Sequence, residues 1–192
     1  DGSIQDGSLT IAGKTRDDEI ACQAQITLKQ EAPFTAMAQI AGLKLEHHLA
    51  LPSDLFVTVS GEAHAGGELL APDTLVADMQ LHEVQLRFDE SQIRNTRPVQ
   101  LRYTQKSVEI EDLVMKGLGT DVILRGHIPF NGMADLRATL AGDLAAFQRF
   151  APYAHELRGP FEADLWLQGM LKAPTLSGEV VVRQATFTLP SL

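Results

Sequence analysis

Apolar and polar residues alternate at a period of two along most of this sequence, and no other feature constrains the fold as strongly. Between Phe161 and Gln168, every second residue is apolar, and three of the four residues between them are polar. Successive side chains of a β-strand point to opposite faces, so the pattern is typical of strands with one apolar face. Other alternating runs cover 20–29, 55–59, 75–81, 84–88, 99–103, 136–140 and 180–189. The sequence therefore predicts a mostly β chain.

Short turn signals separate these runs. They are Asp6-Gly7, 16–19, Gly66-Gly67, 117–119, Asn131-Gly132 and Gly159-Pro160. Connections this short join neighbouring antiparallel strands, because parallel strands need crossovers of about a dozen residues or more. We therefore expect an antiparallel meander. Within the last run the alternation changes phase at Arg183-Gln184, which predicts a β-bulge.

Two segments depart from the strand pattern. Apolar residues recur at helical spacing from Leu144 to Ala151, and Asp143 before them can cap a helix, so we expect one short amphipathic helix over 143–153. Residues 43–51 fit a strand or a loop, and we interpret them as strand. The chain starts at Asp1 and ends in an alternating run. We expect 1–192 to be a single elongated β module, a segment of a longer repeat-like protein.

Composition excludes several classes of protein. The chain has 16 Lys and Arg against 25 Asp and Glu, a net charge of -9, and no basic cluster. Nucleic-acid binding depends on such clusters, so no nucleic-acid partner is expected. No apolar stretch approaches the ~18 residues of a membrane-spanning helix. A single cysteine rules out an internal disulfide framework.

No arrangement of residues typical of catalysis or metal binding occurs in the sequence. The six histidines are scattered, and the adjacent His47 and His48 would point to opposite faces of a strand. Cys22 lies on the apolar side of its run, so we expect a buried, inert thiol. The chain also lacks a G-x-S-x-G elbow, a phosphate-binding loop and a calcium-loop spacing. We expect no enzymatic activity, no metal site and no cofactor.

One unit of the sequence recurs at an offset of about a hundred residues. Ala71-Pro72 and Ala173-Pro174 each precede a similar alternating run, 74–81 in the first copy and 175–182 in the second. The alternation continues into 84–88 and 185–189. Two copies of a strand-turn-strand unit would produce this match, although any two amphipathic strands share part of the pattern.

Three motifs in the second half carry a family resemblance. They are the Gly-Asp-Leu-Ala-Ala-Phe of 142–147, the Leu-Arg-Gly-Pro-Phe-Glu-Ala-Asp-Leu-Trp-Leu-Gln-Gly of 157–169, and the Ala-Pro-Thr-Leu-Ser-Gly-Glu-Val of 173–180. In this order they resemble a module of the TamB proteins. These are inner-membrane-anchored components of the translocation and assembly module, in the AsmA-like superfamily of Gram-negative bacteria. The resemblance is clear over 99–192 and looser over 55–88.

The resemblance implies a periplasmic β-structure that curls into an open U-shaped trough, or β-taco, similar to bridge-like lipid-transfer proteins. Its implied function is to carry phospholipid between the inner and outer membranes. The implied partners are phospholipid acyl chains, neighbouring modules of the same chain and an Omp85-type outer-membrane barrel protein. The implied parent protein is anchored in the inner membrane.

Physical chemistry permits such a role, because each buried acyl methylene contributes about 0.8 kcal/mol. The candidate lipid-facing wall consists of Ile26, Leu28, Val57, Val59, Leu75, Met79, Leu86, Phe88, Leu101, Tyr103, Leu136, Leu140, Leu165, Leu167, Val180, Val182 and Phe187. The same residues would equally form the packed core of a sandwich or barrel, and the sequence does not separate these interpretations. Two other functions remain open. One is an assembly module that contacts an outer-membrane barrel through edge strands, and the other is a closed lipocalin-like binding barrel.

Overall fold

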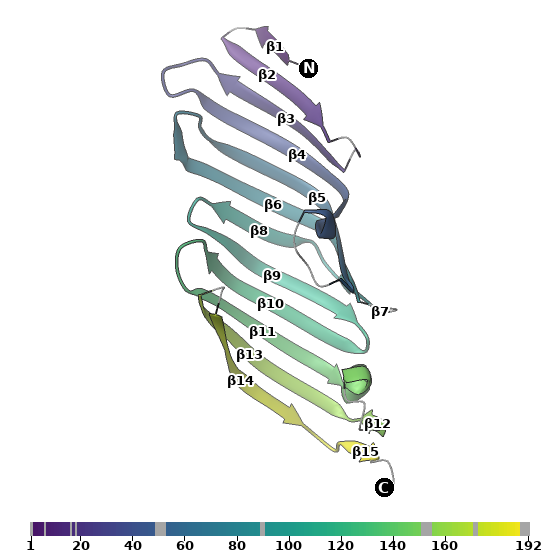
Figure 1. Ribbon diagram of the computed structural model, residues 1–192. Helices are drawn as coiled ribbons and strands as arrows, with labels where there is room; N and C mark the ends of the chain where they lie inside the picture. The colour runs from purple at the N-terminus through teal and green to yellow at the C-terminus, as the bar shows by residue number, and fades with distance from the viewer. Residues whose placement is uncertain are drawn as a thin grey trace.

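The computed structural model contains one large antiparallel sheet of thirteen strands and a separate sheet of two (Figure 1). The structure describes residues 2–5, 7–15, 17, 19–48, 53–88, 91–150, 155–170 and 173–188, and the backbone alone at 5, 149, 150, 155, 187 and 188. The strands are β1 (Gly2–Gln5), β2 (Ser8–Lys14), β3 (Ile20–Thr27), β4 (Pro33–Lys44), β5 (Leu55–Glu68), β6 (Ala71–Phe88), β7 (Ser91–Asn95), β8 (Val99–Thr104), β9 (Ser107–Gly117), β10 (Thr120–Pro129), β11 (Ala134–Asp143), β12 (His155–Arg158), β13 (Pro160–Met170), β14 (Ala173–Val182) and β15 (Thr186–Thr188). Two 3-10 segments, η1 (Leu45–His47) and η2 (Leu144–Phe150), complete the list. The predicted mostly β, antiparallel meander is confirmed.

Strands of the large sheet follow one another in chain order from β1 to β14, with one variation. The long strand β6 pairs with both β7 and β8, which together act as one interrupted strand between β6 and β9. Asn95 occupies the interruption, where its side-chain oxygen accepts a hydrogen bond from the Val84 N–H at 2.7 Å. Its amide nitrogen donates to the carbonyls of His82 and Arg97 at 3.0 and 2.8 Å.

The described strands do not close into a barrel. The pairing order begins at β1 and ends at β14, and Figure 1 shows these two strands at opposite ends of the sheet. A closed lipocalin-like barrel would pair its first and last strands. That alternative is therefore excluded for the described part of the chain.

Pairing register places the alternating residues on two chemically different faces. Leu9, Ile26 and Phe34 are direct partners across β2, β3 and β4, and Val122, Leu140, Ala163 and Val180 are partners across β10 to β14. Direct partners in a sheet share a face. We call this the apolar face and the opposite one the polar face. Among the described strand pairs of the large sheet, no Asp, Glu, Lys or Arg lies on the apolar face.

Glycines on the apolar face allow strands to approach more closely than a Cβ would permit. A Cβ on Gly126 would lie 2.2 Å from the Asp135 carbonyl oxygen, and one on Gly178 would lie 2.2 Å from that of Asp164. Their φ angles of 141° and 146° also fall where side-chain-bearing residues are rare. In-strand glycines of this kind mark bends and close approach of backbones in a sheet.

The buried core lies near one margin, around β5 to β9. It consists of Val57, Val59, Leu81, Val84, Val99 and Met115. Leu45 of η1 packs against this cluster, and the Glu46 carboxylate accepts a hydrogen bond from the Val57 N–H at 3.2 Å. Hydrogen bonds from its own backbone N–H and from that of Val57 lower the pKa of Glu46. The segment η1 therefore covers the apolar face at this margin.

The predicted α-helix over 143–153 is wrong in type. The chain forms the 3-10 segment η2 (Leu144–Phe150), and the rest of the predicted helix, 151–153, lies outside the described residues. Leu144, Phe147 and Phe150 recur at a spacing of three, which is the period of a 3-10 helix. The predicted cap is present, since Asp143 Oδ1 accepts a hydrogen bond from the Ala145 N–H at 2.8 Å.

Three other local predictions are corrected. The Gly66-Gly67 pair lies inside β5, and the turn falls at 69–70, where the Thr74 hydroxyl accepts a hydrogen bond from Glu68 N–H at 2.7 Å and donates one to the Ala71 carbonyl at 2.7 Å. Residues 43–51 are a strand only as far as Lys44, and then form η1, while 49–51 lie outside the described residues. The phase change at Arg183-Gln184 is a break between β14 and β15, which pairs with β12.

Candidate functional site

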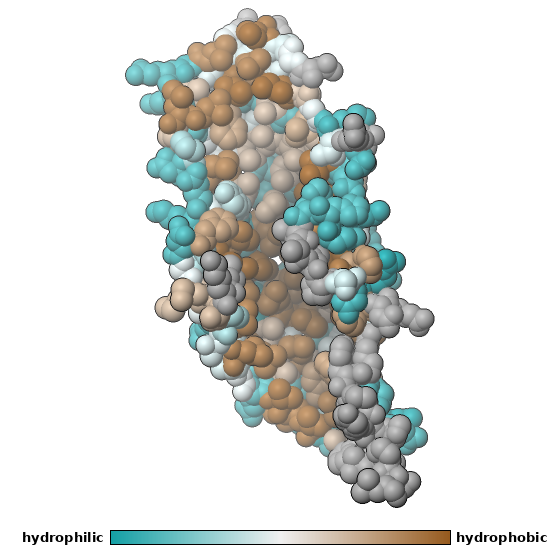
Figure 2. Space-filling view, viewed as in Figure 1, coloured by the Kyte–Doolittle hydropathy of each residue, from teal (hydrophilic) through white to brown (hydrophobic). Residues whose placement is uncertain are grey.

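A continuous apolar surface is the main candidate for a functional site. Figure 2 shows hydrophobic atoms along the length of one face, with hydrophilic atoms along both margins. In the described part of the chain, no second sheet or α-helix covers it. Most of its side chains are half-buried by their neighbours in the sheet.

The structure brings together nearly all the residues predicted for the wall. On the apolar face lie Ile26, Val57, Val59, Leu75, Met79, Leu86, Phe88, Leu101, Tyr103, Leu136, Leu140, Leu165, Leu167, Val180 and Val182. Leu28 follows the end of β3 in a turn and is 53% exposed. The side chain of Phe187 lies outside the described residues.

Exposure varies along this face. Val57 and Val59 are 8% and 7% exposed within the core, whereas Leu176 and Val180 on β14 are 63% and 57% exposed. Ile4 at the other end of the sheet is 71% exposed. The apolar face is thus closed at the η1 margin and open at both end strands.

Small residues form much of the apolar face in the first half, and the predicted wall did not include them. They are Cys22, Ala24, Ala36, Ala38, Ala63, Ala65 and Ala77, which are strand partners across β3 to β6. In the second half the corresponding positions are mostly Leu, Ile and Val. These positions do alternate with polar residues in the sequence, but most of them are alanine, which gives a weaker apolar pattern than Leu, Ile or Val.

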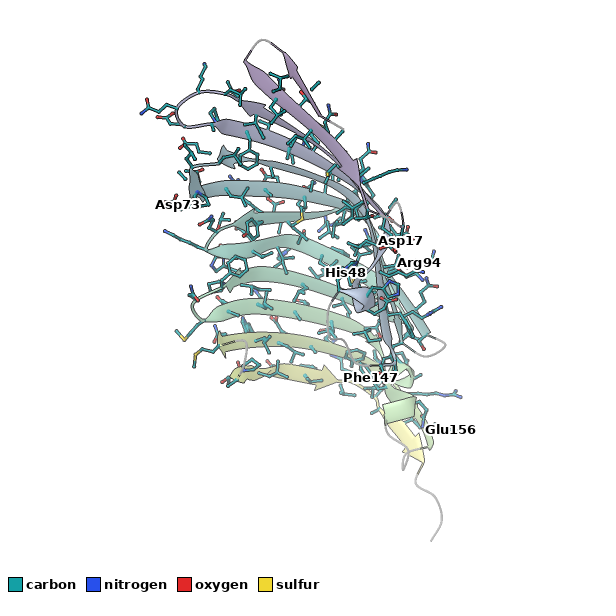
Figure 3. All side chains as sticks on the ribbon, turned by 45° about the horizontal axis from the view of Figure 1, so that its top comes forward. Asp17, His48, Asp73, Arg94, Phe147 and Glu156 are labelled. Atoms are coloured by element: carbon teal, nitrogen blue, oxygen red, sulfur yellow. The ribbon has the colours of Figure 1, made fainter. Side chains whose placement is uncertain are left out.

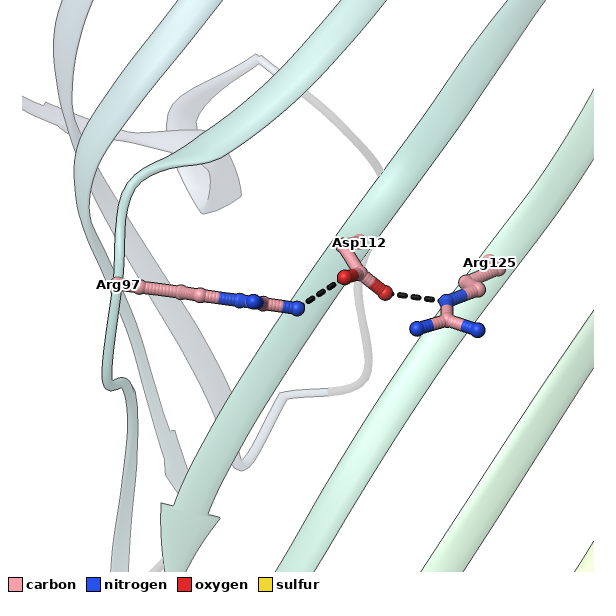
Figure 4. Close-up of polar contacts among 3 residues, drawn as sticks. All are labelled: Arg97, Asp112 and Arg125. Atoms are coloured by element: carbon pink, nitrogen blue, oxygen red, sulfur yellow. Dashed lines mark hydrogen bonds and ion pairs between the residues drawn. The ribbon is translucent and has the colours of Figure 1, made fainter.

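The opposite face carries ion pairs between neighbouring strands. The Asp112 carboxylate contacts the guanidinium groups of both Arg97 and Arg125 (Figure 4). Arg137 donates to Asp164, with Nε 2.8 Å from Oδ1, and its guanidinium lies over the Trp166 ring at 5.2 Å. Hydrogen bonds from Arg125 and Arg137 lower the pKa of Asp112 and of Asp164, respectively. This face is suited to contact with water.

Charged side chains also gather at the margins. Figure 3 shows Asp17, His48 and Arg94 at the same margin, and Asp73 at the other.

Phe147 of η2 stacks edge-on against Phe161 of the apolar face, with ring centroids 5.2 Å apart. The two 3-10 segments therefore cover the apolar face at one margin.

The described residues contain no group of three His, Cys, Asp or Glu side chains able to hold a metal ion. The sulfur of Cys22 was expected to be buried, but this residue is exposed, because the face on which it lies has no covering layer. Within the described residues, no helix has the length and apolar character needed to cross a membrane.

Comparison with known proteins finds one family match, which lies in the second half of the chain. Residues 111–192 match the TamB C-terminal domain. The matched region runs from within β9 to the end of the chain and contains the three motifs that carry the resemblance, so the predicted similarity to TamB is confirmed there. No curated protein and no solved structure matches the chain.

The repeat suggested by the sequence is present only in part. Residues 71–88 form the single strand β6, whereas 173–188 form β14 and β15, which lie in different sheets, so the predicted strand-turn-strand unit is wrong for the first copy. Both β6 and β14 begin with Ala-Pro, and a 3-10 segment precedes each of them by two or three elements. Figure 1 shows η1 and η2 at the same margin of the sheet. The second copy of the suggested repeat lies within the TamB match.

Proposed function

We propose that this chain is a segment of a hydrophobic conduit that carries phospholipid between two membranes, with the sheet curled into an open U-shaped trough. One observation supports it most directly: a continuous apolar face lies on a single-layered sheet without a covering layer in the described residues. Exposed apolar surfaces of this extent mark ligand or interaction sites in soluble proteins. The residues of the candidate lipid-facing wall would contact the acyl chains.

The match of residues 111–192 to the TamB C-terminal domain supports the same proposal. TamB is a family of transport and assembly proteins rather than of enzymes. In this proposal the parent protein is anchored in the inner membrane of a Gram-negative bacterium, and this segment lies in the periplasm. The chain is a single elongated β module whose neighbours continue the trough and contribute to outer-membrane biogenesis.

Lipid analysis of the purified segment tests the proposal. We expect phospholipid to copurify and to be detected by native mass spectrometry and solvent extraction. Leu167→Asp should remove most of it, because a carboxylate on the apolar face repels acyl chains. Gln168→Asp is the matched control, since the adjacent side chain lies on the polar face. Equal lipid content in both variants, with the β circular-dichroism signal retained, would refute the conduit.

A second candidate function rests on the sheet edges. β1 and β14 are the end strands of the described sheet, and unpaired edges can accept a further strand. An assembly module would use such an edge to contact an Omp85-type barrel and aid the insertion of outer-membrane proteins. A well-folded segment that carries no lipid would favour this function.

A further inference from the structure

A recess lined mainly by polar residues opens on the polar face at the margin opposite η1 and η2, where two hairpin turns meet. Its volume is about 570 Å³, and its walls include Thr104, Lys106, Ser107 and His127. The β10–β11 turn is tied to the β8–β9 turn by a hydrogen bond from the Phe130 N–H to the Lys106 carbonyl at 2.9 Å. Figure 1 shows both turns side by side at this margin.

The β8–β9 turn places hydroxyl groups and an ammonium group at this recess. The hydroxyls of Thr104 and Ser107 lie 3.1 Å apart, and that of Thr104 donates to the Ser107 carbonyl at 3.4 Å. The Lys106 N–H donates to the Thr104 hydroxyl at 3.3 Å. Lys106 is exposed and takes part in none of the ion pairs of the described residues. A free ammonium beside hydroxyl groups is suited to a phosphate oxygen.

Two carboxylates lie next to His127, a lining residue of the recess. His127 is the direct strand partner of Glu109 on one side and of Asp135 on the other. Glu109 is also the partner of Arg102, and Asp135 accepts a hydrogen bond from Gln168 Nε2 at 3.1 Å. These two carboxylates would repel an isolated anion, but they would attract the ammonium of a dipolar group whose phosphate contacts Lys106. The charges therefore complement a group that carries both signs.

An apolar bridge connects the recess to the apolar face. Phe130 is 47% exposed, and its ring centroid lies 5.6 Å from that of Tyr103, which belongs to the apolar face. Met133, in the same turn, is 74% exposed. Large exposed apolar side chains are unusual in turns and mark interaction sites when they are grouped.

We propose that one phospholipid molecule binds across this margin. Its phosphate and ammonium occupy the recess beside Lys106, Glu109 and Asp135, and its acyl chains pass over Phe130 and Tyr103 onto the apolar face. The inference rests on the proposed function and adds the headgroup class and the place where it is held. The opposite margin is covered by η1 and η2, so a lipid would enter from the recess side.

Titration with dihexanoyl phosphatidylethanolamine, kept below its micelle concentration, tests this site by calorimetry. Lys106→Gln should weaken binding about fivefold, because a charge-assisted hydrogen bond at an exposed site is lost. Phe130→Ser should weaken it about tenfold through lost apolar contact. Lys29→Gln and Met37→Ser are matched controls, because both residues are exposed and lie outside the recess, and they should leave binding unchanged.

Two further ligands distinguish the possible outcomes. Dodecyl maltoside, which has an uncharged headgroup, should bind wild type and Lys106→Gln equally. Inorganic phosphate binding as tightly as the phospholipid would overturn the proposal in favour of a simple anion site. Phospholipid binding that neither Lys106→Gln nor Phe130→Ser weakens would overturn the headgroup site while leaving the conduit intact. Failure of both lipid and detergent to bind wild type would refute the conduit as well.

Discussion

Single glycines determine how closely neighbouring strands approach on the apolar face. Gly126→Ala would place a Cβ 2.2 Å from the Asp135 carbonyl oxygen at a φ of 141°. We expect the free energy of unfolding to fall by at least about 2 kcal/mol, measured by urea denaturation. In Gly13→Ala, the control on the same face, the new Cβ would lie 3.9 Å from Cys22 Sγ. Its stability should be unchanged or higher by up to about 1 kcal/mol, and an equal loss in both variants would contradict the role of Gly126.

Carboxylates on the polar face make stability depend on pH. Asp112 and Asp164 have a lowered pKa because arginines donate to them, so their stabilisation is present above the unfolded-state pKa of about 4 and is lost as pH falls through the lower folded-state values. A variant with Asp112→Asn and Asp164→Asn should therefore lose less stability than wild type between neutral pH and about pH 3. Urea unfolding at both pH values measures this. Equal losses of unfolding free energy in the two proteins would contradict the role of Asp112 and Asp164 in this pH dependence.

At the scale of elements, the β9–β10 hairpin carries strain that can be removed. Leu118 and Gly119 form its two-residue turn with φ angles of 54° and 70°, and positive φ at both positions is typical of a type I′ turn. Asparagine tolerates this region better than leucine, so Leu118→Asn should raise the free energy of unfolding by about 0.5 to 1 kcal/mol. Leu118→Ala is the control and should bring no gain. A stabilised Leu118→Ala would indicate a benefit from removing exposed apolar surface instead.

Alternation predicted the strands well where large apolar residues carried it, as in β8 and β13. Alternation did not predict the places where strands turn or are interrupted when residues other than glycine, proline or Asn-Gly pairs form the turn. Thr74 organises the turn at 69–70, and Asn95 replaces backbone partners between β7 and β8. The predicted wall residues lie on one face of the sheet, because the face on which a side chain lies depends only on the strand period and on the pairing register. The recess at Lys106 was not predicted, because two turns distant in sequence form it.

On the scale of the whole molecule, the arrangement is a single layer with one water-facing and one apolar side. The TamB match covers residues 111–192, and the same antiparallel sheet continues through the first half of the chain. The open apolar surface at both end strands is consistent with further modules continuing the sheet. In the proposed conduit, acyl chains occupy the apolar face along this layer.

The single cysteine provides the most direct test of that claim. Cys22 is exposed on the apolar face, so a polarity-sensitive fluorophore can be attached there without adding a thiol. On addition of phospholipid, its emission should shift to the blue. The matched sample combines Cys22→Ser with Gln23→Cys, which moves the label to the polar face of the same strand, and its emission should stay unchanged. A shift at neither position, or an equal shift at both, would contradict the account.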